Sequence, residues 1–536
     1  MTEAAGSLQR SSAVMALGTV ASRGTGFLRI AALTGALGLS RVADPYNVAN
    51  TLPNVVYELL LGGVLTSVVV RPLVQAARED DDDGERFAQG LLTFVLLALG
   101  ICVLLGELLA PYIVRAYGGK LADDQVELAT ALLRVFLPQV LFYGAGATMG
   151  AILNARGRFG APMAVPVLNN VVVVTALLVF VTLPGPRPPD PQGLTTAQFL
   201  VLAAGTTFGI VAQTLALVPF LRKAGFRFRP RLLDRARLRT LARLGGWVFV
   251  YVIANQLGYF VVVRIATGAL QGGYSAYTYA FQLFSLPHAI VAVSIITALA
   301  PTISGHAVAG DLARVRHDLS QGLRLIAVIL VPGALGLVAL ARPVAVAAFA
   351  RGAFTVEDAE LTGRVLVAFA IGLLPFSALQ LLTRVFYWLE DSRTPALVNI
   401  LVNVVDVVVV LVLAWRLEGS ALVVGMAAGY TLSKAVGAVL LARILRRRLG
   451  GLDGRRVVRT VVRTLVAGGV GALGAYGVEA IVRTFLGGSL AGAMVAVVAA
   501  VAVGAALYVA MARQMRIAEV TSVFEMVRGR LGRGTP

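Results

Sequence analysis

Charged residues are scarce in this 536-residue chain. They make up 14% of it, against about a quarter in an ordinary soluble domain. Cysteine occurs once, as Cys102, which excludes an internal disulfide and a thiolate metal cluster. The three histidines are scattered, and the sequence has neither a G-x-x-x-x-G-K-[ST] nor an H-E-x-x-H string. Since no carboxylate pair is set up for acid–base chemistry either, an enzyme is disfavoured.

Long apolar runs dominate what the chain does contain. Apolar residues make up 58% of the sequence, and the mean hydropathy is +0.82. About 20 consecutive apolar residues cross the core of a bilayer, whereas barrel strands are alternating segments of ~10 residues. The runs therefore predict an all-α polytopic membrane protein with about fourteen transmembrane helices. We expect these at residues 13–38, 48–76, 88–116, 127–153, 160–183, 197–221, 244–269, 275–303, 321–349, 362–389, 395–416, 420–442, 460–485 and 489–512.

The excess of basic residues orients these spans. The net charge is +19, and only three of the 47 basic residues are lysines. Arginines gather in the segments 222–243 and 443–459 and in the tail after residue 512. Because cytoplasmic loops retain positive charge and face anionic lipid, both termini are predicted to be cytoplasmic in a plasma membrane. Nucleic acid is not an expected partner.

The same basic loops divide the chain into predicted lobes. They separate an N-lobe of six helices (1–225) and a C-lobe of six helices (226–448) from a C-terminal helix pair (449–513) and a basic cytoplasmic tail (514–536). A weak internal repeat supports this division, because residues 130–174 align without gaps on 363–407. Phe136, Pro162 and Asn170 then match Phe369, Pro395 and Asn403. Two such pseudo-symmetric halves usually enclose a cavity.

Ionisable residues inside the spans are the candidate binding residues, because each costs at least ~2.5–3.5 kcal/mol to insert. Arg23 and Arg29 lie six residues apart in the first span, so their side chains are about 120° apart around the helix and share a broad face. We interpret them as the lining of an anion-accepting cavity. The alternative is a structural ion pair with Asp44 or Glu58.

Further charges lie in the second half of the chain. Arg264, Arg384 and Lys434 add cations to its spans, although Arg264 could instead extend to the membrane surface. Asp406 follows Asn403 by about one helical turn, and their oxygens could hold a monovalent cation such as Na⁺. The alternative for this pair is an ordinary polar contact between helices. No other cofactor is indicated.

Several strings point to one family. They are SRGTGFLR (22–29), ADPYNVANTLPN (43–54), GGVLTSVVVRPLV (62–74), ILNARGRFGAPMAVPVLNN (152–170), LPHAIVAVSIITALAPTIS (286–304), RGAFT (351–355) and FYWLEDSRTPALVNILVN (386–403). In this order they resemble the MurJ (MviN) family of lipid II flippases, within the superfamily of multidrug and polysaccharide exporters. The arginine-rich, lysine-poor composition resembles that of an actinobacterial member.

This resemblance implies two six-helix lobes around a central cavity, with Arg23, Arg29 and Asp44 among the cavity residues. It also implies a sodium site in the second lobe of some members, to which Asn403 and Asp406 would correspond.

The chain departs from the family where well-studied members carry charged residues. It has Tyr57 and Glu58 after the LPN string, and Phe281, Gln282 and Ser285 before the LP of the eighth span. These departures remove cationic anchors for the substrate.

The resulting functional prediction is a lipid II flippase. It would carry an undecaprenyl-pyrophosphate-linked peptidoglycan precursor to the outer leaflet by alternating access. Its expected partners are lipid II and membrane lipids, with cell-wall synthesis or division proteins as further candidates. The alternatives are an exporter of another polyprenyl-linked glycan or of drugs, and a membrane scaffold that recruits partners through its basic loops.

Overall fold

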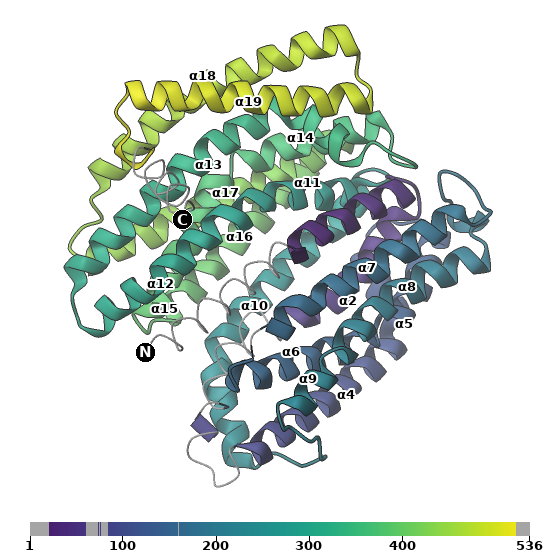
Figure 1. Ribbon diagram of the computed structural model, residues 1–536. Coiled ribbons are helices and arrows are strands. Elements are labelled where there is room, and N and C mark those ends of the chain that lie inside the picture. Colours follow the sequence, from purple (N-terminus) through teal and green to yellow (C-terminus); the bar gives the residue numbers. More distant parts are fainter. Residues whose placement is uncertain (1–20, 60–72, 74, 77–83, 159, 521–536) are drawn as a thin grey trace, which may run out of the picture. The chain divides into compact units, whose positions relative to one another are not determined.

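The structure, a computed structural model, describes residues 21–59, 73, 75–76, 84–158 and 160–520. All the regular elements among these residues are helices (Figure 1). Eleven are long and apolar enough to cross a membrane, or up to twelve if the bent pair Val356–Ala370 and Leu373–Trp388 forms one span. The prediction of an all-α polytopic protein is confirmed. The count of fourteen is not confirmed, because the described parts of the first two helices fall short of the 18-residue minimum.

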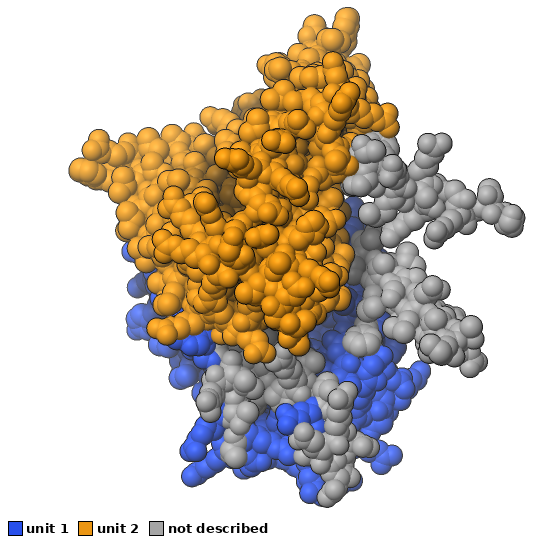
Figure 2. All heavy atoms as spheres, turned by 90° about the vertical axis from the view of Figure 1, so that its left-hand side faces the viewer, with its two compact units in different colours: residues 1–272, 352–354 blue, residues 273–351, 355–536 orange. Residues whose placement is uncertain are grey.

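The chain divides into two compact units, which Figure 2 distinguishes by colour. Unit 1 contains residues 1–272 and 352–354, and unit 2 contains residues 273–351 and 355–536. The predicted lobe boundaries at residues 225, 448 and 513 stay predictions. In unit 1 the described helices are residues 21–37, α2 (Ala43–Leu59), α4 (Glu85–Tyr117), α5 (Asp123–Phe136), α6 (Gln139–Ala155), α7 (Gly160–Thr182), η2 (Pro191–Gly193), α8 (Thr196–Leu215), α9 (Val218–Lys223) and α10 (Arg235–Ala269). In unit 2 they are α11 (Gly273–Pro287), η3 (His288–Ala292), α12 (Val293–Val308), α13 (Leu312–Phe349), α14 (Val356–Ala370), α15 (Leu373–Trp388), α16 (Arg393–Arg416), α17 (Gly419–Arg448), α18 (Gly454–Leu486) and α19 (Leu490–Gln514).

The outward faces of the helices are apolar. In α4, Leu97, Ile101, Leu104 and Leu108 recur every three or four residues, and each is more than half exposed. The opposite face of the same helix, which includes Leu99, is buried. So large an apolar stripe is stable against lipid but not against water, in agreement with a multi-pass membrane protein.

The internal repeat has a structural counterpart within each unit. Phe136 is the last residue of α5, and the α5–α6 break follows it at Pro138, which cannot donate a helical hydrogen bond. Phe369 lies at the end of α14, where the chain bends by 49° into α15. Both phenylalanines are fully buried and each meets a tyrosine edge-on, Phe136 with Tyr46 at 5.6 Å and Phe369 with Tyr277 at 4.9 Å.

Unit 2 contains two further departures from regular helix. A π-helix directly follows Pro287, and it holds the Nδ1 atom of His288 2.8 Å from the Ser377 hydroxyl of α15. Leu340 in α13 has φ −111° and ψ 15°, three residues before Pro343. Because proline lacks an N–H and clashes with the preceding turn, Pro343 accounts for that kink.

Candidate functional site

The two arginines of the first span lie on a helix whose neighbours differ along its length. Arg23 is exposed, whereas Arg29, nearly two turns later, is half-buried. The Arg29 guanidinium bonds the hydroxyl of Tyr46, a fully buried residue of α2. The same hydroxyl lies 3.0 Å from the Thr206 hydroxyl of α8. Arg29 is thus held by a polar chain that crosses three helices of unit 1.

An asparagine of α7 fixes the position of this first helix. The Asn170 side chain donates to the Ser22 carbonyl oxygen at 3.3 Å and to the Thr25 hydroxyl at 3.0 Å. A Cβ atom at Gly26 would lie 3.7 Å from the Asn170 amide nitrogen, so glycine permits the helices to approach closely here. These contacts hold the segment that carries both arginines against α7.

The structure describes the side chain of only one of the two acids that could pair with these arginines. Asp44 is only 2% exposed and lies in the first turn of α2, two residues before Tyr46. The side chains of Tyr57 and Glu58 lie outside the described residues. The structure therefore brings Asp44 and Arg29 to the same end of α2, through Tyr46, and leaves the alternative with Glu58 undecided.

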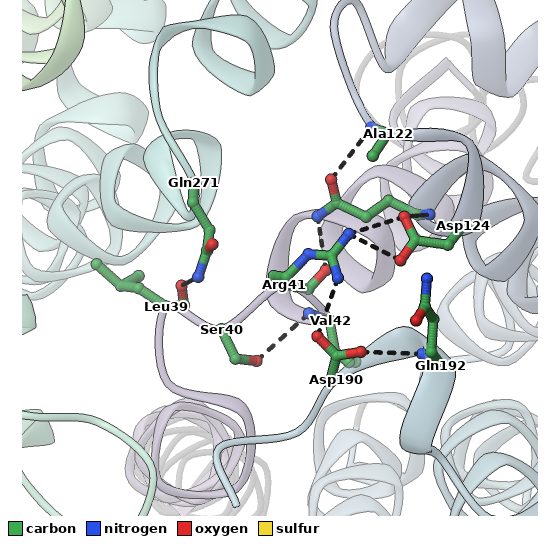
Figure 3. Close-up of polar contacts among 10 residues, drawn as sticks. Leu39, Ser40, Arg41, Val42, Ala122, Asp124, Asp190, Gln192 and Gln271 are labelled. Carbon is green, nitrogen blue, oxygen red and sulfur yellow. Dashed lines mark hydrogen bonds and ion pairs between the residues drawn. The ribbon is translucent and has the colours of Figure 1, made fainter. Parts of the chain in front are cut away.

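A second polar cluster, which the sequence analysis missed, surrounds Arg41 in the turn before α2 (Figure 3). One guanidinium nitrogen donates to both carboxylate oxygens of Asp124, at 2.9 and 2.7 Å, and the other donates to Asp190 at 3.1 Å. The bond to Asp190 is the main reason why the pKa of Arg41 is raised, although partial burial opposes it. We call Arg41, Asp124 and Asp190 the arginine clamp. It joins the turn before α2, the first turn of α5 and the residue before η2 in unit 1.

Backbone contacts reinforce the turn that carries the clamp. The Gln125 side chain donates to the Arg41 carbonyl oxygen at 2.7 Å. Gly38 has φ +60°, and a Cβ atom there would lie 2.3 Å from the Ala353 carbonyl oxygen. The Ala353 N–H also donates to the Gly35 carbonyl oxygen at 2.8 Å. Only glycine fits at position 38, so the conformation of the turn is strongly determined.

The remaining predicted cations have different surroundings. Arg264 of α10 donates to the Ala116 carbonyl oxygen at 2.6 Å and to that of Arg115 at 3.4 Å, at the C-terminal end of α4. A cation at this end satisfies free carbonyls and complements the helix dipole, so these contacts account for Arg264 without a substrate. Arg384 is exposed on α15. Their roles in substrate binding stay predictions.

The predicted sodium residues lie inside unit 2. Asn403 and Asp406 of α16 are 8% and 5% exposed, and the Asn403 amide donates to the Asn399 carbonyl oxygen at 2.8 Å. Lys434 of α17 is 9% exposed, and its charge acts on the Asp406 carboxylate. Within the described ranges no three His, Cys, Asp or Glu residues are grouped as metal ligands. The sequence identifies Lys434 as a cation of the next span, but spacing along one helix could not pair it with Asp406, because the two residues lie on different helices.

The residues of the eighth span that differ from the charged residues of well-studied family members have structural roles. The Phe281 ring packs against Phe369 at 5.5 Å and Tyr430 at 5.6 Å, within the aromatic core of unit 2. The Ser285 hydroxyl donates to the carbonyl oxygen of Gln282, whose side chain is exposed. Position 281 therefore contributes packing rather than charge.

Comparisons with known proteins agree with this fold. A family model described as lipid II flippase MurJ matches residues 33–496. A probable lipid II flippase MurJ of Bdellovibrio bacteriovorus is 30% identical over 480 residues, which cover 86% of each chain. That of Vibrio cholerae is 28% identical over 482 residues, covering 86% of this chain and 87% of the relative.

Solved structures resemble the chain in fold. A lipid II flippase MurJ in an inward closed conformation has a TM-score of 0.75 at 18% identity, with 94% of this chain and 99% of that chain covered. An inward-facing MATE-family multidrug transporter of the MOP superfamily has a TM-score of 0.65 at 15% identity, with 80% and 96% covered.

Proposed function

Because the chain belongs to the lipid II flippase MurJ family, we propose that it carries lipid II from the inner to the outer leaflet of the plasma membrane by alternating access. The match over residues 33–496 is the observation that carries this proposal. Relatives that cover most of the chain support it. Since the family consists of transporters, the chain is a transporter rather than an enzyme.

The first-span arginines suit the substrate's chemistry. Lipid II carries a pyrophosphate between its headgroup and its prenyl tail. A guanidinium remains charged within the membrane and can bind phosphate through two parallel hydrogen bonds. Arg29 is held in place by the Tyr46 hydroxyl, which reduces the entropy lost when it binds an anion. We propose that Arg29 and the more exposed Arg23 bind the pyrophosphate in a central cationic cavity.

The proposed orientation places both termini in the cytoplasm. The basic side chains in the last turn of α9 and in the segment before α10 are exposed, where they would face anionic lipid headgroups: Arg222, Lys223, Arg227, Arg229 and Arg231. The arginine clamp would then lie on the outer side of the membrane, because the segments that carry its residues follow helices that run outward. Lipid II is the proposed substrate, and proteins of cell-wall synthesis or division are the proposed partners.

The test replaces the first-span arginines in cells depleted of their own flippase. R23A, R29A and the double variant are compared with R187A, which removes an exposed arginine from a loop. We expect R29A to lower the exposure of lipid II headgroups at the outer leaflet at least ~10-fold, about 1.4 kcal/mol of binding. R29K should recover only part of it, because lysine binds phosphate through a single point charge.

Two outcomes would contradict the proposal in different ways. Full translocation by a well-expressed R23A/R29A variant would remove these arginines from the mechanism. Failure of the wild-type chain to restore translocation would favour an exporter of another polyprenyl-linked glycan or of drugs. A scaffold would instead tolerate both arginine changes and be sensitive to deletions in residues 222–243.

A further inference from the structure

Two opposite charges are buried together between α16 and α17 of unit 2. The Asp406 side chain is directed at α17, because a Cβ atom at Gly429 would lie 3.8 Å from its Oδ1 atom. Lys434 lies five residues after Gly429 on the same helix. Asp406 and Lys434 are 5% and 9% exposed, so neither charge is solvated by bulk water.

Each of these charges is the other's electrostatic partner. Lys434 is the one charged group found to act on the Asp406 carboxylate, and Asp406 is the one found to act on the Lys434 ammonium, among the described residues. The other titratable groups that face this pair are phenols. Tyr277 of α11 interacts with Asp406, and the Tyr430 ring lies 4.7 Å from the Lys434 Nζ atom. The aromatic face adds a cation–π contact to the ammonium.

The carboxylate still has one oxygen that makes no hydrogen bond. Asp406 Oδ1 is fully buried and has no hydrogen-bond partner among the residues that the structure describes. An unpartnered carboxylate oxygen beside Asn403 is the kind of ligand that a monovalent cation uses, which is the basis of the predicted sodium site. Geometry alone therefore leaves both a sodium ion and the lysine as countercharge for Asp406.

Charge balance decides between them. Asp406 and Lys434 together are neutral, whereas a sodium ion bound to Asp406 would leave a surplus positive charge in the interior of unit 2. Burying an uncompensated ion costs several kcal/mol, and no second carboxylate acts on Asp406 among the described residues to offset it. The residues present therefore do not fit sodium while Lys434 is charged.

We propose that the Lys434 ammonium takes the place of a coupling cation opposite Asp406, so that the protein neither binds sodium there nor needs it for transport. The exclusion of sodium depends on this pair of residues alone. Transport without sodium also rests on the proposed flippase function.

Sodium binding to the purified full-length protein tests the first statement. Equilibrium binding of ²²Na⁺, in a choline chloride background, is measured for the wild type, K434M, D406N and D406N/K434M. We expect no saturable binding to the wild type. K434M removes the charge and keeps a side chain of similar length, so it should bind sodium at least ~10-fold more tightly, about 1.4 kcal/mol. The double variant should lose that binding, and K223M, which removes an exposed lysine, should behave as the wild type.

Each result supports or overturns the proposal. Saturable sodium binding to the wild type that D406N abolishes would overturn it, whether or not K434M folds. A folded K434M that binds no sodium would also overturn it, because Lys434 would then not be what excludes the ion. If sodium does not bind to the wild type but binds to K434M, the result supports the proposal that the Lys434 ammonium takes the place of a sodium ion.

Transport measured separately distinguishes this inference from the proposed function. Lipid II translocation by the wild type should change less than twofold when choline replaces sodium in the medium. A larger loss would overturn sodium independence. If no lipid II moves in either medium, the flippase proposal fails while the binding results still decide the role of Lys434.

Discussion

The arginine clamp offers a quantitative test of how the loops of unit 1 are held together. Arg41 donates to Asp124 through two hydrogen bonds and to Asp190 through one, so removal of its guanidinium leaves two carboxylates without their cation (Figure 3). We expect R41M to lower the free energy of unfolding. D124N and D190N each remove one of the two ion pairs.

Exposure sets the size of the effect. The side chains of Arg41 and Asp190 are 34% and 35% exposed, and that of Asp124 is 19% exposed. Exposed ion pairs contribute ~0–1 kcal/mol, whereas breaking a fully buried pair costs ~3–5 kcal/mol. The clamp lies nearer the exposed limit, so R41M should cost about 1–2 kcal/mol. The coupling between Arg41 and Asp124 should be about 1 kcal/mol, because Asp124 accepts two hydrogen bonds from Arg41 and is less exposed, and the coupling to Asp190 should be smaller.

The assay is a double-mutant cycle in denaturant titrations of the purified protein in mixed micelles. The free energies of unfolding of the wild type, R41M, D124N and R41M/D124N give the coupling energy, and a second cycle uses D190N. Salt provides an internal control, because the Debye length falls from about 10 Å at 0.1 M to about 3 Å at 1 M. Additive effects within ~0.3 kcal/mol that do not change with salt would refute an electrostatic clamp.

Two further predictions concern ion pairs of unit 2. Asp391 accepts hydrogen bonds from the Thr394 N–H at 2.9 Å and from Arg448 at 2.6 Å. These bonds lower the pKa of Asp391 below 3.8, although burial of the carboxyl group opposes the shift. The stabilisation is therefore complete above pH ~4 and is lost as the pH falls through the lowered pKa. D391N should lower the free energy of unfolding by about 1–2 kcal/mol at pH 7, and should have no effect at a pH low enough to protonate Asp391 in the wild type. An effect on the free energy of unfolding that does not change with pH would contradict this. The partly buried ion pair of Arg324 with Glu519 fastens the segment after α19 to α13, so E519Q should speed tryptic cleavage after the exposed Arg516. Cleavage no faster than that of E418Q, a control at an exposed glutamate, would refute this anchor.

The amino-acid sequence alone was sufficient to predict the class of protein and the positions of many helices. The predicted spans 395–416 and 460–485 correspond to Arg393–Arg416 and Gly454–Leu486, because a long apolar run specifies a membrane helix from its own residues. The resemblance to the MurJ family is confirmed by the family match. The repeat matched Phe136 with Phe369, the two residues at which paired helices break, since the same local sequence bends the chain in the same way.

Which charged side chains lie close together became clear from the packing of the helices. Spacing along one helix placed Asn403 near Asp406 but could not pair Asp406 with Lys434, whose charge acts on the carboxylate from the neighbouring helix. The sequence predicts Arg264 as a cation inside a span, whereas in the packed structure its guanidinium donates to the last carbonyl oxygens of α4. Hydropathy is a local property that fixes where helices lie along the chain. Ion pairs between helices depend on which faces pack together, and that is set by contacts between residues far apart in sequence.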